Sequence, residues 1–171
     1  MSTVAAFAYV FPVDRLLLRL KFGGALALAD WAAAAWVDEY DAARASRRVG
    51  AEPRTIVPVP LMRSRQRERG FNQAHEIARG IGQRLGIEVS PVLTRVRDSP
   101  PQAELTSSAR LSNMRGAFAC HEAMRGRTVA IVDDVMTTGA TVEHATRALL
   151  AAGAASVTVW VVARTLRPDE A

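Results

Sequence analysis

The segment from Thr128 to Val162 constrains the fold of this chain more than any other. Thr128 to Val132 form a continuous run of the kind found in strands buried on both faces of a parallel sheet. A helix follows, marked by apolar residues at helical spacing: Val142, Ala145, Leu149 and Ala152. Gly153 ends this helix, and Val157 to Val162 form a second buried strand. A strand, a helix and a strand in so few residues predict a right-handed parallel crossover, so the fold class is α/β.

Further helices and strands are predicted before this segment. Residues 12–21 and 25–43 have helical character, with Gly23-Gly24 as the break between them. Thr55 to Val59 form a short strand whose prolines favour an end position in a sheet.

The middle of the chain continues the alternation of helices and strands. Asn72 is placed to cap a helix over residues 73–85, and Gly86 ends it. Strands are predicted over residues 89–96 and 117–120. The chain of 171 residues fits one compact domain with a mostly parallel central sheet flanked by helices.

Cysteine usage and hydropathy exclude several classes of protein. The single cysteine, Cys120, forms neither an internal disulfide nor a four-cysteine zinc site, and we expect it to be a small buried side chain. No apolar run reaches the roughly 18 residues that span a bilayer. We therefore expect a cytoplasmic protein without membrane insertion.

Positive charge is concentrated in the middle of the chain. The net charge is +5, yet residues 44–127 alone contain 16 Arg and 7 acidic residues. Of the 22 basic residues only Lys21 is a lysine, which indicates a compositional preference for Arg. That preference does not explain the clustering, which favours binding to phosphates, pyrophosphate or nucleic acid.

A turn rich in threonine follows the first buried strand. Its sequence, Val135-Met136-Thr137-Thr138-Gly139-Ala140-Thr141, opens the predicted helix. The start of a helix offers free N–H groups and the positive end of the helix dipole, and Gly139 lets the backbone approach an anion closely. The hydroxyls of Thr137, Thr138 and Thr141 add donors. Together these groups predict a site for a phosphate dianion.

Two adjacent carboxylates, Asp133 and Asp134, stand immediately before this turn. They repel a phosphate but accept hydrogen bonds from a pair of hydroxyls, such as O2 and O3 of ribose. A ribose 5-phosphate satisfies both halves of the site. Neither a Walker A loop nor a dinucleotide fingerprint is present. The alternative is a purely structural arrangement, in which a buried strand leads through an acidic turn into a threonine-capped helix.

The segment Val129 to Thr141 resembles the signature with which type I phosphoribosyltransferases bind 5-phosphoribosyl-1-pyrophosphate (PRPP). Further stretches resemble the ComF/GntX-like members of that superfamily: Val57 to Leu61, Arg63 to Arg69, Gly70-Phe71-Asn72-Gln73, Pro100-Pro101-Gln102, Arg110, Asn113 and Gly116-Ala117-Phe118. The resemblance extends from about residue 9 to residue 165. Family members usually carry an N-terminal four-cysteine zinc module that this sequence does not contain, so no zinc is expected.

The resemblance implies displacement of pyrophosphate from PRPP by an unidentified acceptor. Asp133 and Asp134 are then the catalytic residues, and Arg63, Arg65, Arg67 and Arg69 lie where the pyrophosphate binds. Arginine side chains suit pyrophosphate oxygens, although the same alternation also suits a solvated face or a nucleic-acid track. Mg²⁺ is the expected cofactor, bound mainly by the substrate and water with a minor share from Asp133 and Asp134.

The polar stretch over residues 97–113 corresponds to the mobile loop that covers the active site in the superfamily. Gln102, Arg110 and Asn113 are its candidate functional residues, and a plain solvated linker is the alternative. The fold implied is a single-domain type I phosphoribosyltransferase with a small N-terminal helical hood over residues 1–53 and a core over residues 54–171.

The hood is where such enzymes usually hold the acceptor. Residues 1–53 contain seven of the ten aromatic residues: Phe7, Tyr9, Phe11, Phe22, Trp31, Trp36 and Tyr40. Their rings suit stacking on a planar acceptor, but core packing is the favoured role.

Two classes of function remain open at this point, beside a plain interaction protein that has the PRPP-binding fold but performs no turnover. The first is a phosphoribosyltransferase that uses PRPP, or binds another ribose 5-phosphate ligand. The second is a non-enzymatic accessory protein of competence and DNA uptake, which binds single-stranded DNA or senses PRPP. Candidate partners are therefore single-stranded DNA, competence proteins and a second copy of the chain in a homodimer.

Overall fold

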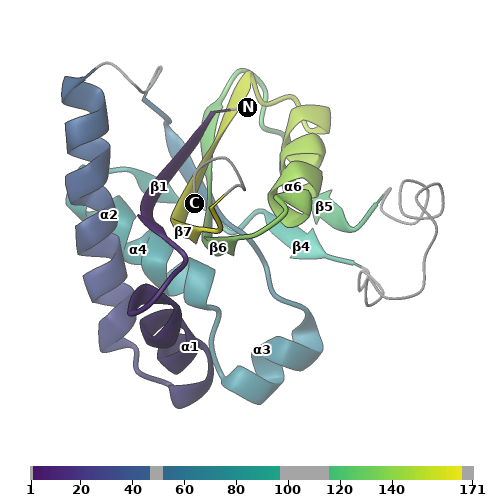
Figure 1. Ribbon diagram of the computed structural model, residues 1–171. Coiled ribbons are helices and arrows are strands. Elements are labelled where there is room, and N and C mark those ends of the chain that lie inside the picture. The colour runs from purple at the N-terminus through teal and green to yellow at the C-terminus, as the bar shows by residue number, and fades with distance from the viewer. Residues whose placement is uncertain (1, 47–51, 97–115, 167–171) are drawn as a thin grey trace.

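The computed structural model describes residues 2–46, 52–96 and 116–166 and contains a five-stranded, fully parallel sheet (Figure 1). The strands run in the order β1-β7-β6-β2-β3. Their bounds are β1 Thr3–Ala8, β2 Thr55–Pro58, β3 Glu88–Val89, β6 Thr128–Met136 and β7 Ser156–Arg164. The parallel order confirms the α/β fold class.

Helices cover both faces of this sheet and make two apolar cores. The helices α1 (Val13–Gly23), α2 (Ala27–Ala45) and α4 (Gln73–Leu85) pack on one face. On the other face lies α6 (Ala140–Ala151). None of the described helices has both the length and the apolar character needed to span a bilayer.

The predicted helices agree closely with the observed ones. The breaks at Gly23-Gly24 and Gly86 are present, and Gly86 has a φ of 69°. Asn72 caps α4, because its side chain accepts a hydrogen bond of 3.0 Å from the Ala74 N–H.

One predicted strand is divided in two. In place of a strand over 89–96, the chain forms β3 and then β4 (Leu93–Arg95), which pairs antiparallel with β5 (Phe118–Cys120). The division falls at Pro91, which has no N–H to donate to a strand ladder. The pair β4-β5 lies beside α6 and forms a small second sheet (Figure 1).

The N-terminal segment, predicted as a helical hood, also contributes a strand to the central sheet. The strand β1 pairs in parallel with β7, with Thr3 opposite Val159. Behind the sheet, Trp36 and Tyr40 of α2 stack with each other and pack against Trp160 of β7, with ring centroids 4.3 Å apart for the two tryptophans. Trp36 and Tyr40 are fully buried or nearly so, which confirms the core-packing role favoured for them. The same role is wrong for Phe11 and Phe22, which are exposed.

Candidate functional site

The threonine-rich turn lies at the carboxyl end of β6, the edge of a parallel sheet where α/β proteins bind ligands. The strand is longer than predicted and continues beyond Val132 through both aspartates to Met136. It continues because β7 runs alongside it, with Asp133 opposite Val161 and Met136 opposite Arg164. The turn therefore begins only at Thr137.

This turn is open to solvent and leads directly into α6. Thr137 and Thr138 are exposed, and Thr141 is half-buried. Gly139 immediately precedes the helix with a φ of 79°, a conformation that strains any residue with a side chain. The end of β6, just before the turn, is held by the residue that follows β7, because the Thr165 N–H donates to the Met136 carbonyl over 3.0 Å. A fixed, exposed helix start is the geometry that an anion site requires.

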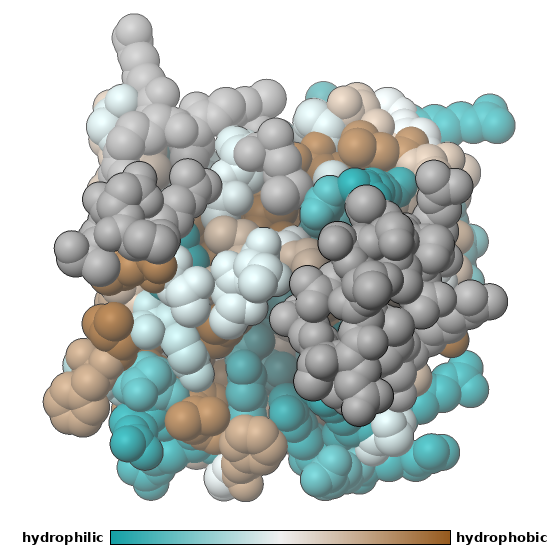
Figure 2. Space-filling view, turned by 45° about the vertical axis from the view of Figure 1, so that its right-hand side comes forward, coloured by the Kyte–Doolittle hydropathy of each residue, from teal (hydrophilic) through white to brown (hydrophobic). Residues whose placement is uncertain are grey.

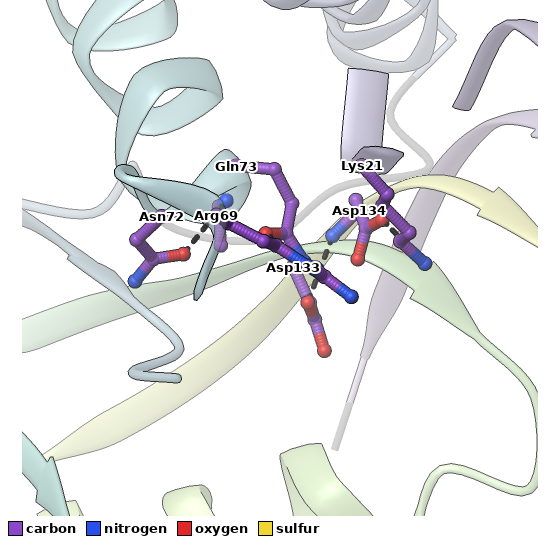
Figure 3. Close-up of polar contacts among 7 residues, drawn as sticks. Lys21, Arg69, Asn72, Gln73, Asp133 and Asp134 are labelled. Carbon is purple, nitrogen blue, oxygen red and sulfur yellow. Dashed lines mark hydrogen bonds and ion pairs between the residues drawn. The ribbon is translucent and has the colours of Figure 1, made fainter. Parts of the chain in front are cut away.

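The two aspartates do not point the same way. Successive residues of a strand face opposite sides of the sheet, so Asp134 lies on the face of α1, α2 and α4 and Asp133 on the face of α6. Asp134 is only 3% exposed, and its Oδ2 is 2.7 Å from the Lys21 Nζ of α1 (Figure 3). Its backbone N–H donates to the Asp133 Oδ1 over 2.9 Å.

These surroundings give Asp133 an unusual carboxylate. Burial of Asp133, followed by the neighbouring charge of Asp134, raises its pKa well above the usual range. The hydrogen bond from the Asp134 N–H and, after it, the charge of Lys21 lower the pKa of Asp133. The sequence predicts that the two carboxylates bind a ribose diol together. In the structure they lie in different environments.

Lys21 was not among the residues that the sequence singled out. Two features mark it in retrospect: it is the only lysine in an arginine-rich chain, and it follows Leu17 by one helical turn. Leu17 and Leu20 are buried, so this side of α1 faces the sheet and carries Lys21 toward Asp134.

The four arginines of the basic segment lie on a helix, α3 (Arg63–Arg69), and not in an extended loop. No residue of α3 is buried. Alternate side chains of a helix point in different directions, so Arg63, Arg65, Arg67 and Arg69 do not form the single row that an extended segment would present. Arg69 bonds the Gln73 Oε1 over 3.0 Å, and its guanidinium lies 4.9 Å from the centre of the Phe22 ring.

A cavity of about 460 Å³ separates α3 from the small second sheet. It is lined by the end of β2, by α3, by the start of α4 and by β4, with Pro58, Arg63, Phe71, His75 and Arg95 among its walls. Neither aspartate nor the threonine-rich turn lines it. The cavity is therefore adjacent to the basic helix but distinct from the predicted phosphate site.

The remaining predictions concern the polar stretch over residues 97–113, the metal site and the single cysteine. Gln102, Arg110 and Asn113 lie outside the described residues. Within the described ranges, no three His, Cys, Asp or Glu side chains gather in a metal-binding group. Cys120 is only partly buried, and its thiol contacts the Glu122 carbonyl.

Comparison with known proteins adds a family match that covers most of the chain. Residues 43–170 match the model of the phosphoribosyl transferase domain. The DNA utilization protein YhgH of Salmonella typhimurium is 37% identical over 95% of this chain and 72% of its own length. Competence protein F of Haemophilus influenzae is 31% identical over 91% of this chain and 69% of its own length. Competence protein ComFC of Bacillus subtilis is 32% identical over 64% of this chain and 44% of its own length.

Proposed function

The chain belongs to the phosphoribosyl transferase domain family, as a ComF-like member, and from this premise we propose that it binds PRPP at the turn Thr137–Thr141. The proposed reaction is transfer of the phosphoribosyl group to an acceptor with release of pyrophosphate. One observation carries the proposal: the turn is exposed, is built around Gly139 in a left-handed conformation, and opens a helix at the carboxyl edge of a parallel sheet.

The 5-phosphate is the part of the ligand that this turn suits best. The first N–H groups of α6 have no partner within the helix, and the helix dipole favours negative charge at that end. Gly139 brings the backbone to the anion without a side chain in the way, and the threonine hydroxyls supply further donors.

The ribose hydroxyls are proposed to bind Asp133. This carboxylate lies two strand residues beyond Ile131 on the face of α6, the same face from which the threonine-rich turn departs. Asp133 is half-buried, and a half-buried carboxylate accepts hydroxyl hydrogen bonds more strongly than an exposed one, because fewer water molecules compete for its oxygens.

The pyrophosphate is proposed to face α3, where Arg63, Arg65 and Arg67 are exposed and Arg69 is half-buried. Glu68 is the only acidic residue within this helix. In the reaction, the bond from ribose C1 to the pyrophosphate oxygen breaks and its electron pair leaves with pyrophosphate. A lone pair of the acceptor forms the new bond to C1. Arginines and a Mg²⁺ ion on the pyrophosphate oxygens would stabilise the leaving charge.

The test is a thermal-shift measurement with PRPP and Mg²⁺. Binding at one hundred times the dissociation constant stabilises a protein by about 2.7 kcal/mol, or roughly 5–10 °C in Tm for this size. We expect that shift for the wild type, and its loss in Asp133→Asn and Gly139→Val. Arg147→Gln, farther along the exposed side of α6, should keep the shift as a matched control. A wild type whose Tm does not respond to PRPP would contradict the proposal.

A second candidate function, binding of single-stranded DNA, is favoured by the surface beside α3. Phe22 is 71% exposed and Phe11 79% exposed, and the Arg69 guanidinium lies over the Phe22 ring. Figure 2 shows apolar and strongly hydrophilic side chains side by side at the lower end of the molecule, where Figure 1 places α1 and α3. Aromatic rings among arginines suit unpaired bases and a phosphate backbone. The relatives named for DNA utilization and competence are consistent with this candidate.

A further inference from the structure

The last turn of α1 directs one cation beneath the edge of the sheet. Leu17 and Leu20 are buried and fix the helix on the sheet, whereas Leu18 and Phe22 are exposed. The side chain of Lys21 is only 19% exposed, so it points inward with the leucines rather than outward with its neighbours. Its position is therefore set by the packing of α1.

The contact that Lys21 makes reaches the candidate ribose site in two steps. Its Nζ lies 2.7 Å from the Asp134 Oδ2, and the side chain of Asp134 is 5% exposed. The backbone N–H of Asp134 in turn donates to the Asp133 Oδ1 over 2.9 Å (Figure 3). Helix α1, which is not part of the threonine-rich turn, is thus connected through Asp134 to the carboxylate of Asp133.

Charge makes this connection necessary. Two neighbouring carboxylates at a partly buried position repel each other, and a buried charge without a partner costs several kcal/mol. An ammonium group is a compact point charge on a flexible stem, whereas a guanidinium is a planar fork of donors. The only lysine of the chain stands at this position.

We propose that Lys21 is a positioning residue for ribose recognition. It neutralises and holds Asp134, and the Asp134 N–H then orients the Asp133 carboxylate so that its second oxygen accepts the 2- and 3-hydroxyls. The inference rests on the proposed function, because it assumes a ribose 5-phosphate ligand. It differs from a structural role for Lys21 in one respect: it predicts an effect on the choice between ribose and deoxyribose.

The test compares ribose 5-phosphate with 2-deoxyribose 5-phosphate by calorimetric titration of each variant. A hydrogen bond to a charged group is worth roughly 10-fold to 100-fold in affinity, so the wild type should prefer the ribose ligand by that factor. Lys21→Met should lose most of this preference while its affinity for the deoxyribose ligand changes less than about threefold. Lys21→Arg, which keeps the charge, should recover part of the preference.

Two further variants separate the proposal from general effects of charge and folding. Arg19→Met removes the same charge from an exposed position of α1 and should leave the preference unchanged. In an Asp134→Asn background, Lys21→Met should have little additional effect, because the partner through which Lys21 acts is already neutral. This double variant leaves no unpaired buried charge, so it remains measurable if Lys21→Met alone fails to fold.

The outcomes are distinguishable. A Lys21→Met variant that keeps the wild-type preference, or that loses affinity for both ligands equally, overturns the role of Lys21 and leaves the proposed function standing. A wild type that binds neither ligand overturns the proposed function and this inference with it.

Discussion

Asp133 and Asp134 are adjacent in β6, yet the protein treats their charges differently. Asp134 is paired with Lys21, so its ionised form is compensated. Ionisation of Asp133 is unfavourable, because burial and the Asp134 charge raise its pKa. Functional residues often carry such a cost, since the ligand later provides the partners that the free protein lacks.

This difference predicts opposite effects of two neighbouring substitutions. A group whose folded pKa is raised makes the folded state less stable above that pKa, and the penalty disappears below its unfolded value of 3.8. Asp133→Asn should therefore raise the Tm at neutral pH, by roughly 2–4 °C for each kcal/mol of unfolding free energy gained. The same substitution should remove PRPP binding. The gain should vanish as the pH falls toward 3.8.

Asp134→Asn is the matched comparison, and it should lower the Tm because it leaves the Lys21 ammonium without its carboxylate. Losses from breaking buried pairs are on the order of 3–5 kcal/mol, and the remaining exposure of Lys21 should place this loss at or below the lower figure. Thermal unfolding between pH 3.5 and 8 measures both variants. The same sign of change for the two would contradict the assignment of roles.

At this scale the sequence predicted the turn but not the separation of the aspartates. The order of threonines and Gly139 is a local pattern whose chemistry can be derived residue by residue. Whether Asp133 and Asp134 share a side depends on where β6 ends, and that is decided by pairing with β7, a contact distant in sequence. Lys21 was missed for the same reason, because it meets Asp134 only after the chain has folded.

Among the elements, α4 was predicted to the residue, whereas α3 was not predicted at all. The apolar face of α4 has helical spacing, and both of its ends carry capping residues. The α3 segment buries no residue, so its alternating arginines reflect no packing, and their spacing alone predicts neither a helix nor a strand. A periodic pattern predicts secondary structure when its residues are buried on one face. Exposed charged residues can occupy any position of a helix or a strand, so their spacing predicts neither.

The cap of α4 also connects two elements, which makes Asn72 a test of how the site is assembled. Its Oδ1 accepts from the Ala74 N–H, and its Nδ2 donates to the Val59 carbonyl at the end of β2, each over 3.0 Å. Asn72→Ala should lower the free energy of unfolding by about 1–2 kcal/mol through loss of the helix cap, and the unpaired Val59 carbonyl adds to this loss.

Asn72→Asp keeps the acceptor and removes the donor, so it should lie between the wild type and Asn72→Ala in urea denaturation. If the two variants were equally destabilised, the cap would contribute nothing and the bond to Val59 would account for the whole effect.

At the scale of the whole molecule, the distribution of charge says more about polyanion binding than the net charge does. The excess of arginine between residues 44 and 127 includes the exposed helix α3, which adjoins Phe22 of α1 through Arg69. Helices α1 and α3 therefore together form the surface on which Phe22 and the exposed arginines lie.

If this surface binds single-stranded DNA, the affinity should fall steeply with salt. Replacing Arg63, Arg65, Arg67 and Arg69 by Gln should reduce the slope of log affinity against log salt by about 3, since each phosphate contact contributes about 0.7 for single strands. Arg79→Gln/Arg147→Gln removes exposed arginines elsewhere and should leave the slope nearly unchanged. Fluorescence anisotropy with a labelled oligonucleotide at several salt concentrations gives these slopes. Equal slopes for the two sets would remove α3 from the DNA surface.

The pairing of β1 with β7 has a consequence for folding during translation. Thr3 finds its partner only in Val159, so the first strand leaves the ribosome long before the strand that it joins. At roughly 5–20 residues per second, translation separates the two by about 8–30 s. Until then β1 has no strand partner, and the five-stranded sheet of the described residues forms only once β7 has paired with it.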